Sequence, residues 1–130
     1  MKLLLDTQCW LWMQVAPEQF SEEALTLIQD NDNELLLSAA SCWEIAIKYA
    51  LGKLSLPEAP ERYVPDRMES SGVDCLAIRM EHALRVASLP FHHRDPFDRL
   101  LVAQAQVERL SLLTADTQLA LYDVNLLLAR

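Results

Sequence analysis

Two short apolar runs, each followed by an aspartate, constrain the fold of this chain more than any other feature. Residues 3–5 lead into Asp6, and residues 112–115 lead into Asp116. Runs of this length suit strands that are buried on both faces, as in parallel sheets covered by helices. Helix-like segments alternate with such runs along the chain, so the sequence predicts an α/β fold with a parallel sheet.

The expected elements follow from the hydrophobic periodicity and from the turn residues between segments. We expect strands at residues 2–6, 34–37, 73–77 and 110–114, with a further edge strand in the tail 123–128. We expect helices at residues 8–15, 21–29, 40–51, 61–70, 80–87, 96–108 and 117–121. No repeat or linker is visible, which favours a single domain over residues 1–130.

The composition narrows the class of protein. The chain has 130 residues, 52% of them hydrophobic, and a formal net charge of −8. Nucleic-acid coat proteins need Lys and Arg at the phosphates, so that class is disfavoured, whereas bound divalent cations would still permit a nuclease. With no apolar run of membrane length and no signal peptide, we expect a cytoplasmic protein without a membrane partner. Cys9, Cys42 and Cys75 are scattered and odd in number, which predicts buried free thiols.

Four acidic residues are candidates for one common site. Asp6 and Asp116 follow predicted strands, while Glu44 and Asp98 lie in the first turns of predicted helices. In an open parallel sheet the crevice lies beyond the carboxyl ends of the strands, so side chains placed there converge. Converging carboxylates repel one another unless protons or a cation intervene, which predicts a Mg²⁺ or Mn²⁺ site.

Each of these acids also has a purely structural interpretation. Asp6 and Asp116 stand where an N-cap is favourable, and Asp95 fits the N-cap before Pro96 at the first helical position. Asp98 then falls at the third helical position, where a negative charge favours the helix dipole. We interpret Asp95 as mainly structural with a supporting role, and Asp98 as a ligand that the fixed helix start aims into the crevice.

Glu44 and Lys48 are the only charges in residues 39–51. A helix that is apolar nearly all round is buried, so its one acid needs a reason. Glu44 has capping-box spacing from Ser41 and the favourable i,i+4 order for an ion pair with Lys48. These two interpretations compete for one carboxylate, and a third places Lys48 at a scissile phosphate.

Histidine and tryptophan side chains are the remaining candidates. His92 and His93 are of a metal-binding residue type, but their loop position favours a solvated pair. Trp10, Trp12 and Trp43 have rings that stack on bases, although in apolar helices such residues are more typical of a core or an interface.

Several motifs, taken in order, resemble one known family. They are residues 3–7 (LLLDT), 38–48 (SAASCWEIAIK), 51–54 (LGKL), 82–84 (HAL), 89–90 (LP), 92–101 (HHRDPFDRLL) and 113–116 (LTAD). Each motif is weak alone, but their order and spacing resemble the PIN domain, in particular VapC-type toxins of prokaryotic toxin–antitoxin pairs. One departure is Gln8, where many relatives carry His or Ser.

The resemblance implies a PIN-like three-layer α/β/α domain with a mainly parallel sheet of four or five strands. It implies a metal-dependent endoribonuclease, a cognate VapB-type antitoxin and a homodimer. For such an enzyme we expect a substrate of single-stranded or loop RNA, where the backbone is accessible. An apolar surface around Trp10, Trp12 and Trp43 is the expected docking groove for the antitoxin.

The resemblance also carries residue roles onto this sequence. The catalytic acids, which would hold two Mg²⁺ or Mn²⁺ ions, are Asp6, Glu44, Asp98 and Asp116. The supporting residues are Asp95, Thr7, Ser38 and Thr114. Apart from the resemblance, the mechanism needs positive charge at the RNA backbone, and the candidate phosphate contacts are Lys48, Lys53, Arg94 and Arg99.

Two other functions compete with this hypothesis. One is a catalytically silent PIN fold that binds RNA or an antitoxin. The other is a phosphatase of the haloacid-dehalogenase type, which requires a second aspartate two residues after Asp6, where this chain has Gln8.

Overall fold

A five-stranded parallel sheet forms the centre of the computed structural model, which describes residues 1–130. The strand order is β3-β2-β1-β4-β5, and each strand runs parallel to its neighbours. The strands are β1 (Lys2–Leu5), β2 (Glu34–Ser38), β3 (Val73–Leu76), β4 (Ser111–Thr114) and β5 (Asn125–Leu128). The predicted parallel α/β fold is confirmed, including the edge strand in the tail.

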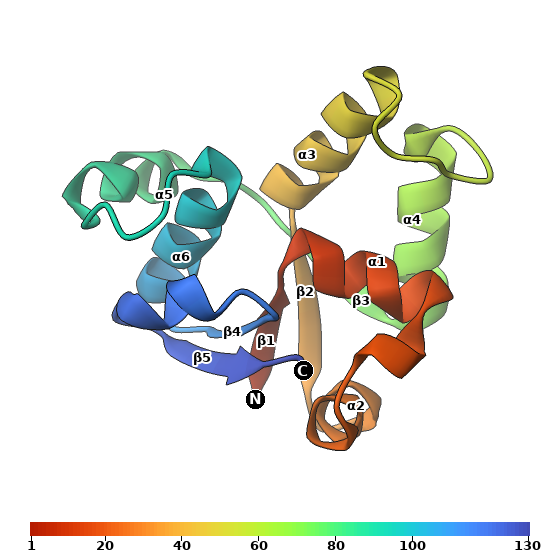
Figure 1. Ribbon diagram of the computed structural model, residues 1–130, viewed down its shortest axis with the longest axis horizontal. Helices are drawn as coiled ribbons and strands as arrows, with labels where there is room; N and C mark the ends of the chain where they lie inside the picture. Colours follow the sequence, from red (N-terminus) through yellow and green to blue (C-terminus); the bar gives the residue numbers. More distant parts are fainter.

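Six α-helices connect and cover these strands (Figure 1). They are α1 (Thr7–Val15), α2 (Glu22–Gln29), α3 (Ala39–Ala50), α4 (Pro60–Ser71), α5 (Met80–Arg85) and α6 (Pro96–Glu108). Short 3₁₀ turns lie at Pro17–Gln19, Val86–Ser88 and Thr117–Leu121. The helix expected at residues 80–87 is therefore divided into α5 and a 3₁₀ turn, and the turn at Pro17–Gln19 was not expected.

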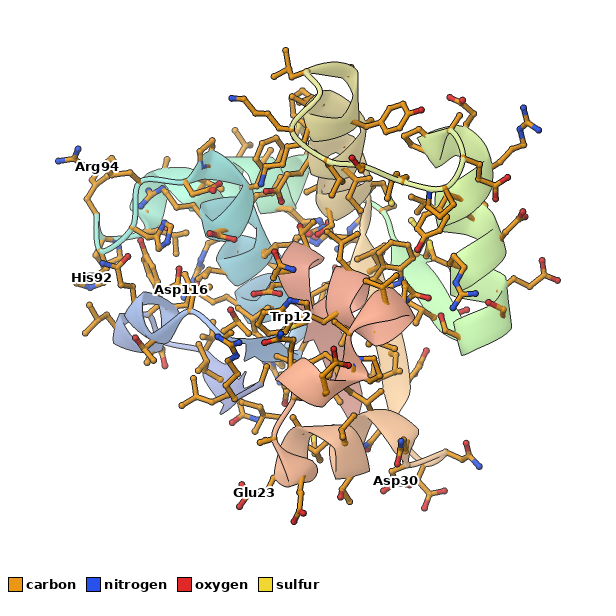
Figure 2. All side chains as sticks on the ribbon, turned by 45° about the vertical axis from the view of Figure 1, so that its right-hand side comes forward. Trp12, Glu23, Asp30, His92, Arg94 and Asp116 are labelled. Atoms are coloured by element: carbon orange, nitrogen blue, oxygen red, sulfur yellow. The ribbon has the colours of Figure 1, made fainter.

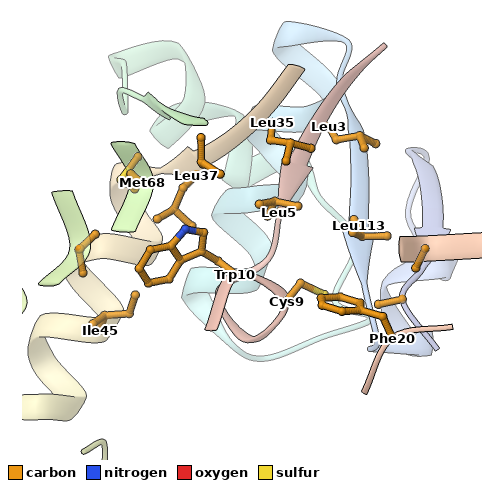
Figure 3. Packing of buried hydrophobic residues seen from close by; sticks show 14 of the residues in the cluster. Leu3, Leu5, Cys9, Trp10, Phe20, Leu35, Leu37, Ile45, Met68 and Leu113 are labelled. Carbon is orange, nitrogen blue, oxygen red and sulfur yellow. The ribbon is translucent and has the colours of Figure 1, made fainter. Parts of the chain in front are cut away.

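The sheet buries apolar side chains on both of its faces. Successive side chains of a strand point to opposite faces, so Leu3 and Leu5 join one core cluster and Leu4 the other. The first cluster includes residues of α1, α2 and α4, with Trp10 packed beside Leu5 (Figure 3). The second includes residues of α6, which Figure 1 shows with α5 on the opposite side from α1, α2 and α4. The arrangement is the expected three-layer α/β/α fold.

The chain order creates a crevice between β1 and β4. Strands β2 and β3 add outward on one side of β1, and β4 and β5 then add on its other side. Connections leave β1 and β4 in opposite directions, and ligand sites of open α/β sheets lie at such a switch point. The backbone amide of Asp6 donates to the carbonyl of Leu113 at 3.0 Å, which places Asp6 at this point.

Two expectations about apolar side chains were wrong. Cys9 is buried and Cys42 half-buried, but Cys75 is exposed, because β3 is an edge strand with an uncovered side. Trp10 is fully buried in the core, whereas Trp43 is 60% exposed, so the tryptophans do not form one docking groove. All three cysteines are free thiols, as predicted.

No helix combines the length and the apolar character that a membrane crossing requires.

Candidate metal centre

A pocket of about 490 Å³ opens at the carboxyl ends of β1 and β4. Its lining includes five carboxylates, which are Asp6, Glu44, Asp95, Asp98 and Asp116. Two lysines, Lys48 and Lys53, and the side chain of Thr7 also line it. The structure thus brings together the four acids that the sequence analysis singled out, with Asp95 beside them.

Asp6 has both of the roles considered for it, the helix cap and a place in the pocket. One carboxylate oxygen accepts a hydrogen bond from the amide of Cys9 at 2.7 Å and so caps α1. The other accepts a hydrogen bond from the hydroxyl of Thr114. Burial raises the pKa of Asp6 above its usual value, and these two hydrogen bonds oppose the rise only in part. The carboxylate therefore gains from a nearby positive charge.

Glu44 is held from two sides. It is buried and accepts hydrogen bonds from the Thr7 hydroxyl and from Nζ of Lys48, both at 2.6 Å. The predicted ion pair is confirmed, and the bond to Glu44 raises the pKa of Lys48. The predicted capping box is wrong, because α3 begins earlier and Ser38 is its N-cap. Ser41 instead lies 2.9 Å from the Thr7 hydroxyl, so Thr7 links α1 to α3.

Asp98 also lies in surroundings that disfavour its charged form. Asp95 caps α6 as predicted, accepting from the amides of Phe97 at 2.8 Å and Asp98 at 3.3 Å. Pro96 is the first helical residue, and Asp98 follows in the first turn. Burial, together with the charges of Asp95 and Asp6, raises the pKa of Asp98 to about 7. Without a cation, the charged form of Asp98 is therefore disfavoured in this pocket.

His93 was missed as a part of the site. Its Nε2 lies 2.7 Å from Oδ2 of Asp116 and 3.6 Å from Oδ2 of Asp98. The prediction of a solvated pair is wrong for His93, and it holds only for His92, which is exposed. The contact joins residues 23 positions apart, so no local sequence pattern reveals it.

Asp116 is more accessible than Glu44 or Asp98, with 35% of its side chain exposed. It follows β4, and its Oδ1 accepts from the amide of Gln118 at 3.0 Å, so the predicted N-cap is present. Its own amide donates to the hydroxyl of Thr114 at 3.0 Å. Thr114 thereby fixes both strand-terminal acids, since the same hydroxyl donates to Asp6.

Two of the predicted phosphate contacts and one predicted supporting residue lie elsewhere. Arg99 is buried and donates to the carbonyls of Pro90 and Val86, so we withdraw it as a phosphate contact. Arg94 is exposed and outside the pocket lining, and Figure 2 shows it pointing outwards. Ser38 is outside the pocket lining and donates to Oε1 of Gln104 at 2.5 Å. A strand-end position does not by itself aim a side chain at the crevice.

The donor set of the pocket suits a hard divalent cation. Carboxylate and hydroxyl oxygens are the ligands that Mg²⁺ and Mn²⁺ prefer. Burial, together with neighbouring carboxylates, raises the pKa of both Asp6 and Asp98, so their charged forms are disfavoured in the pocket. A bound cation would stabilise those charged forms, so the residues present fit a metal.

A parallel α/β domain with carboxylates gathered at its switch point is the class that the fold and the site define. A family model described as the PIN domain matches residues 3–125. The match covers most of the sequence, and the chain therefore belongs to the PIN domain family.

Other relatives are similar over different shares of the chain. Ribonuclease VapC16 of Mycobacterium tuberculosis (strain ATCC 25618 / H37Rv) is 52% identical over 60 residues, 46% of this chain and 43% of that protein. The match thus spans less than half of that relative. VapBC2 from Rickettsia felis, solved with a promoter DNA fragment, covers 100% of both chains at 14% identity and a TM-score of 0.74. The match to VapBC-1 from nontypeable Haemophilus influenzae covers 98% of this chain and 97% of that chain, at 17% identity and a TM-score of 0.64. Because these identities are below 20%, the likeness to the two solved structures supports the fold alone.

Proposed function

We propose that this protein is a metal-dependent endoribonuclease that hydrolyses RNA phosphodiester bonds. One observation carries the proposal: Asp6, Glu44, Asp98 and Asp116 converge in one pocket at the switch point of the sheet. The raised pKa values of Asp6 and Asp98 support it, because a bound cation would stabilise the charged forms that burial disfavours. The name of the mycobacterial relative supports the substrate class.

In this proposal Asp6, Asp98 and Asp116 hold Mg²⁺ or Mn²⁺, and Glu44 holds or orients a second ion. Bound divalent cations lower the pKa of a coordinated water and stabilise charge on a phosphate in hydrolysis at phosphorus. Thr114 orients Asp6, and Thr7 orients Glu44.

The two lysines supply a different function. Lys48 has 50% of its side chain exposed and both pairs with Glu44 and lines the pocket, so it can meet a phosphate oxygen without leaving the site. Lys53 lines the same pocket. We expect both side chains to hold the RNA backbone, whose charge they partly neutralise.

Cleavage of a labelled single-stranded RNA is the direct test. We expect activity with Mn²⁺ or Mg²⁺, loss with EDTA, and loss in Asp6→Asn and Asp98→Asn. Glu22→Gln, which removes an exposed charge in α2, is the matched control and should retain full activity. RNA binding without cleavage in the parent protein would favour the catalytically silent alternative, and activity that survives both aspartate substitutions would exclude the metal site.

We also propose that the protein is the toxin of a VapBC-type pair, with a VapB-type antitoxin and a homodimeric state. The VapBC names of the structural neighbours support the partner class. The net charge of −8 suits a basic partner segment at the pocket. Co-expression with the protein encoded beside it, followed by purification of one tagged chain, should yield a complex with reduced cleavage activity.

A further inference from the structure

His93 lies close enough to two acids of the site to be mistaken for a metal ligand. One ligand atom each from His93, Asp98 and Asp116 can be chosen so that all three lie within 4.8 Å of one another. An imidazole in that set would favour a transition metal over Mg²⁺. The hydrogen bonds of the ring decide whether its nitrogen is available.

Both ring nitrogens of His93 have identified partners. The backbone amide of Asp95 donates to Nδ1 at 3.1 Å, so Nδ1 is an acceptor and carries no proton. A neutral imidazole then carries its proton on Nε2, which faces Oδ2 of Asp116 at 2.7 Å. Coordination through Nε2 needs a lone pair that this tautomer lacks. Ligation would require the proton to move to Nδ1, where it would face the N–H of Asp95.

The loop that carries His93 is anchored from inside the protein. Nη1 of the buried Arg99 donates to the carbonyl of Pro90 at 2.9 Å and to the hydroxyl oxygen of Tyr122 at 3.2 Å. The backbone amide of His93 donates to the same Tyr122 oxygen at 3.0 Å. The position of His93 is therefore set by side chains of the core and not by the solvent.

We propose that His93 is a positioning residue, which holds the Asp116 carboxylate through its Nε2–H and does not coordinate the metal. Asp116 is then fixed at both oxygens, by Gln118 at Oδ1 and by His93 at Oδ2. Each oxygen keeps a second lone pair for a cation. This inference rests on the proposed metal site and adds a role for a residue outside the pocket lining. Partners of this kind typically change metal affinity by about 10- to 100-fold.

The first experiment reads the tautomer in the metal-free protein, without RNA. Long-range ¹H–¹⁵N correlation spectra distinguish a ring protonated at Nε2 from one protonated at Nδ1. Among the three histidines, the His93 signals are those that vanish in His93→Gln and persist in His92→Gln. We expect the Nε2–H form, and an Nδ1–H form would overturn the proposal.

The second experiment uses Mn²⁺ as the probe, with affinity measured by calorimetry and coordination by pulsed EPR. We expect no directly coordinated nitrogen on Mn²⁺, a loss of about 10- to 100-fold in His93→Ala, and most of the affinity restored in His93→Gln, whose amide can donate to Asp116. His92→Ala should bind like the parent. A strong ¹⁴N coupling, or equal affinity in His93→Ala and the parent, would overturn the proposal. Intact Mn²⁺ binding without RNA cleavage would instead refute the nuclease and leave the role of His93 standing.

Discussion

Asp98→Asn should stabilise the metal-free protein, although the substitution removes a proposed ligand. The pKa of Asp98 is raised from 3.8 to about 7, so the folded state binds more protons than the unfolded state between these values. Stability of the metal-free protein is therefore expected to fall as the pH rises from about 4 to 7. Asparagine carries no charge in either state, so the variant should lack this loss.

The size of this stability gain follows from the pKa shift of Asp98 and from the position of Asp98 in α6. A shift from 3.8 to about 7 sets a ceiling of roughly 4 kcal/mol for the cost of the charge in the fold. The side chain is 24% exposed, and solvent reduces that cost, so about 1–3 kcal/mol is a realistic range. The substitution also removes a favourable negative charge at the N-terminus of α6, which reduces the gain in stability by about 0.3–1 kcal/mol. The net expectation at pH 8 is a gain of roughly 1–2 kcal/mol.

Thermal and urea unfolding in EDTA at pH 4 to 8 provide the measurement. A gain of this size should raise Tm at pH 8 by roughly 3–10 °C, and the difference should vanish near pH 4. Added Mn²⁺ should raise the Tm of the parent more than that of the variant, because the metal stabilises the state that binds it. Asp66→Asn, an exposed charge on α4, is the control and should change stability by less than about 0.5 kcal/mol.

A loss of stability in metal-free Asp98→Asn at pH 8 would refute this reasoning. It would show that the favourable interaction of the Asp98 charge with the N-terminus of α6 outweighs burial and the repulsion by Asp95 and Asp6. A parent protein whose metal-free stability does not fall between pH 4 and 7 would contradict it equally.

Three other perturbations have defined outcomes. Arg99→Met should lower the free energy of unfolding by about 2–4 kcal/mol in urea titrations, because buried carbonyls lose their donor, and an unchanged midpoint would contradict the anchoring role. Gln104→Leu should cost about 1–3 kcal/mol in the same assay, since the buried Ser38 hydroxyl loses its partner; a stabilised variant would show that this bond is dispensable. Thr7→Val should reduce RNA cleavage by about tenfold with a small change in Tm, because it removes the donor to Glu44, whereas full activity would exclude Thr7 from the site.

The fold and the acidic pocket could be predicted because both depend on local patterns. An apolar run of strand length predicts its own burial, and parallel strands bring their carboxyl ends to one edge. Asp6 directly follows β1 and Asp116 lies two residues after the end of β4, so their convergence required only the sheet topology. Pro96 marked the start of α6, which made the position of Asp98 predictable as well.

The errors arose where contacts between distant segments decide the outcome. Arg99 is an ordinary helix residue in the sequence, yet α6 turns it towards the carbonyls of residues 86–90. His93 lies in a polar loop, and its contact with Asp116 depends on how that loop returns to the sheet. Ser38 ends β2 as the acids end other strands, but its side chain turns to the buried Gln104. The contacts of these three side chains depend on how the whole chain packs.

The position of β1 in the middle of the sheet has a consequence for the order in which the site is completed during folding. Thr114 and Asp6 share a hydrogen bond across 108 positions, so the environment of Asp6 requires a strand that is synthesised much later. Strands β1 and β2 can pair early, yet one side of β1 stays open until β4 arrives. Contacts of this sequence separation form slowly and late. A partly synthesised chain therefore has Asp6 and Glu44 without Asp98 and Asp116, and the complete set of acids exists only when nearly the whole domain has been made.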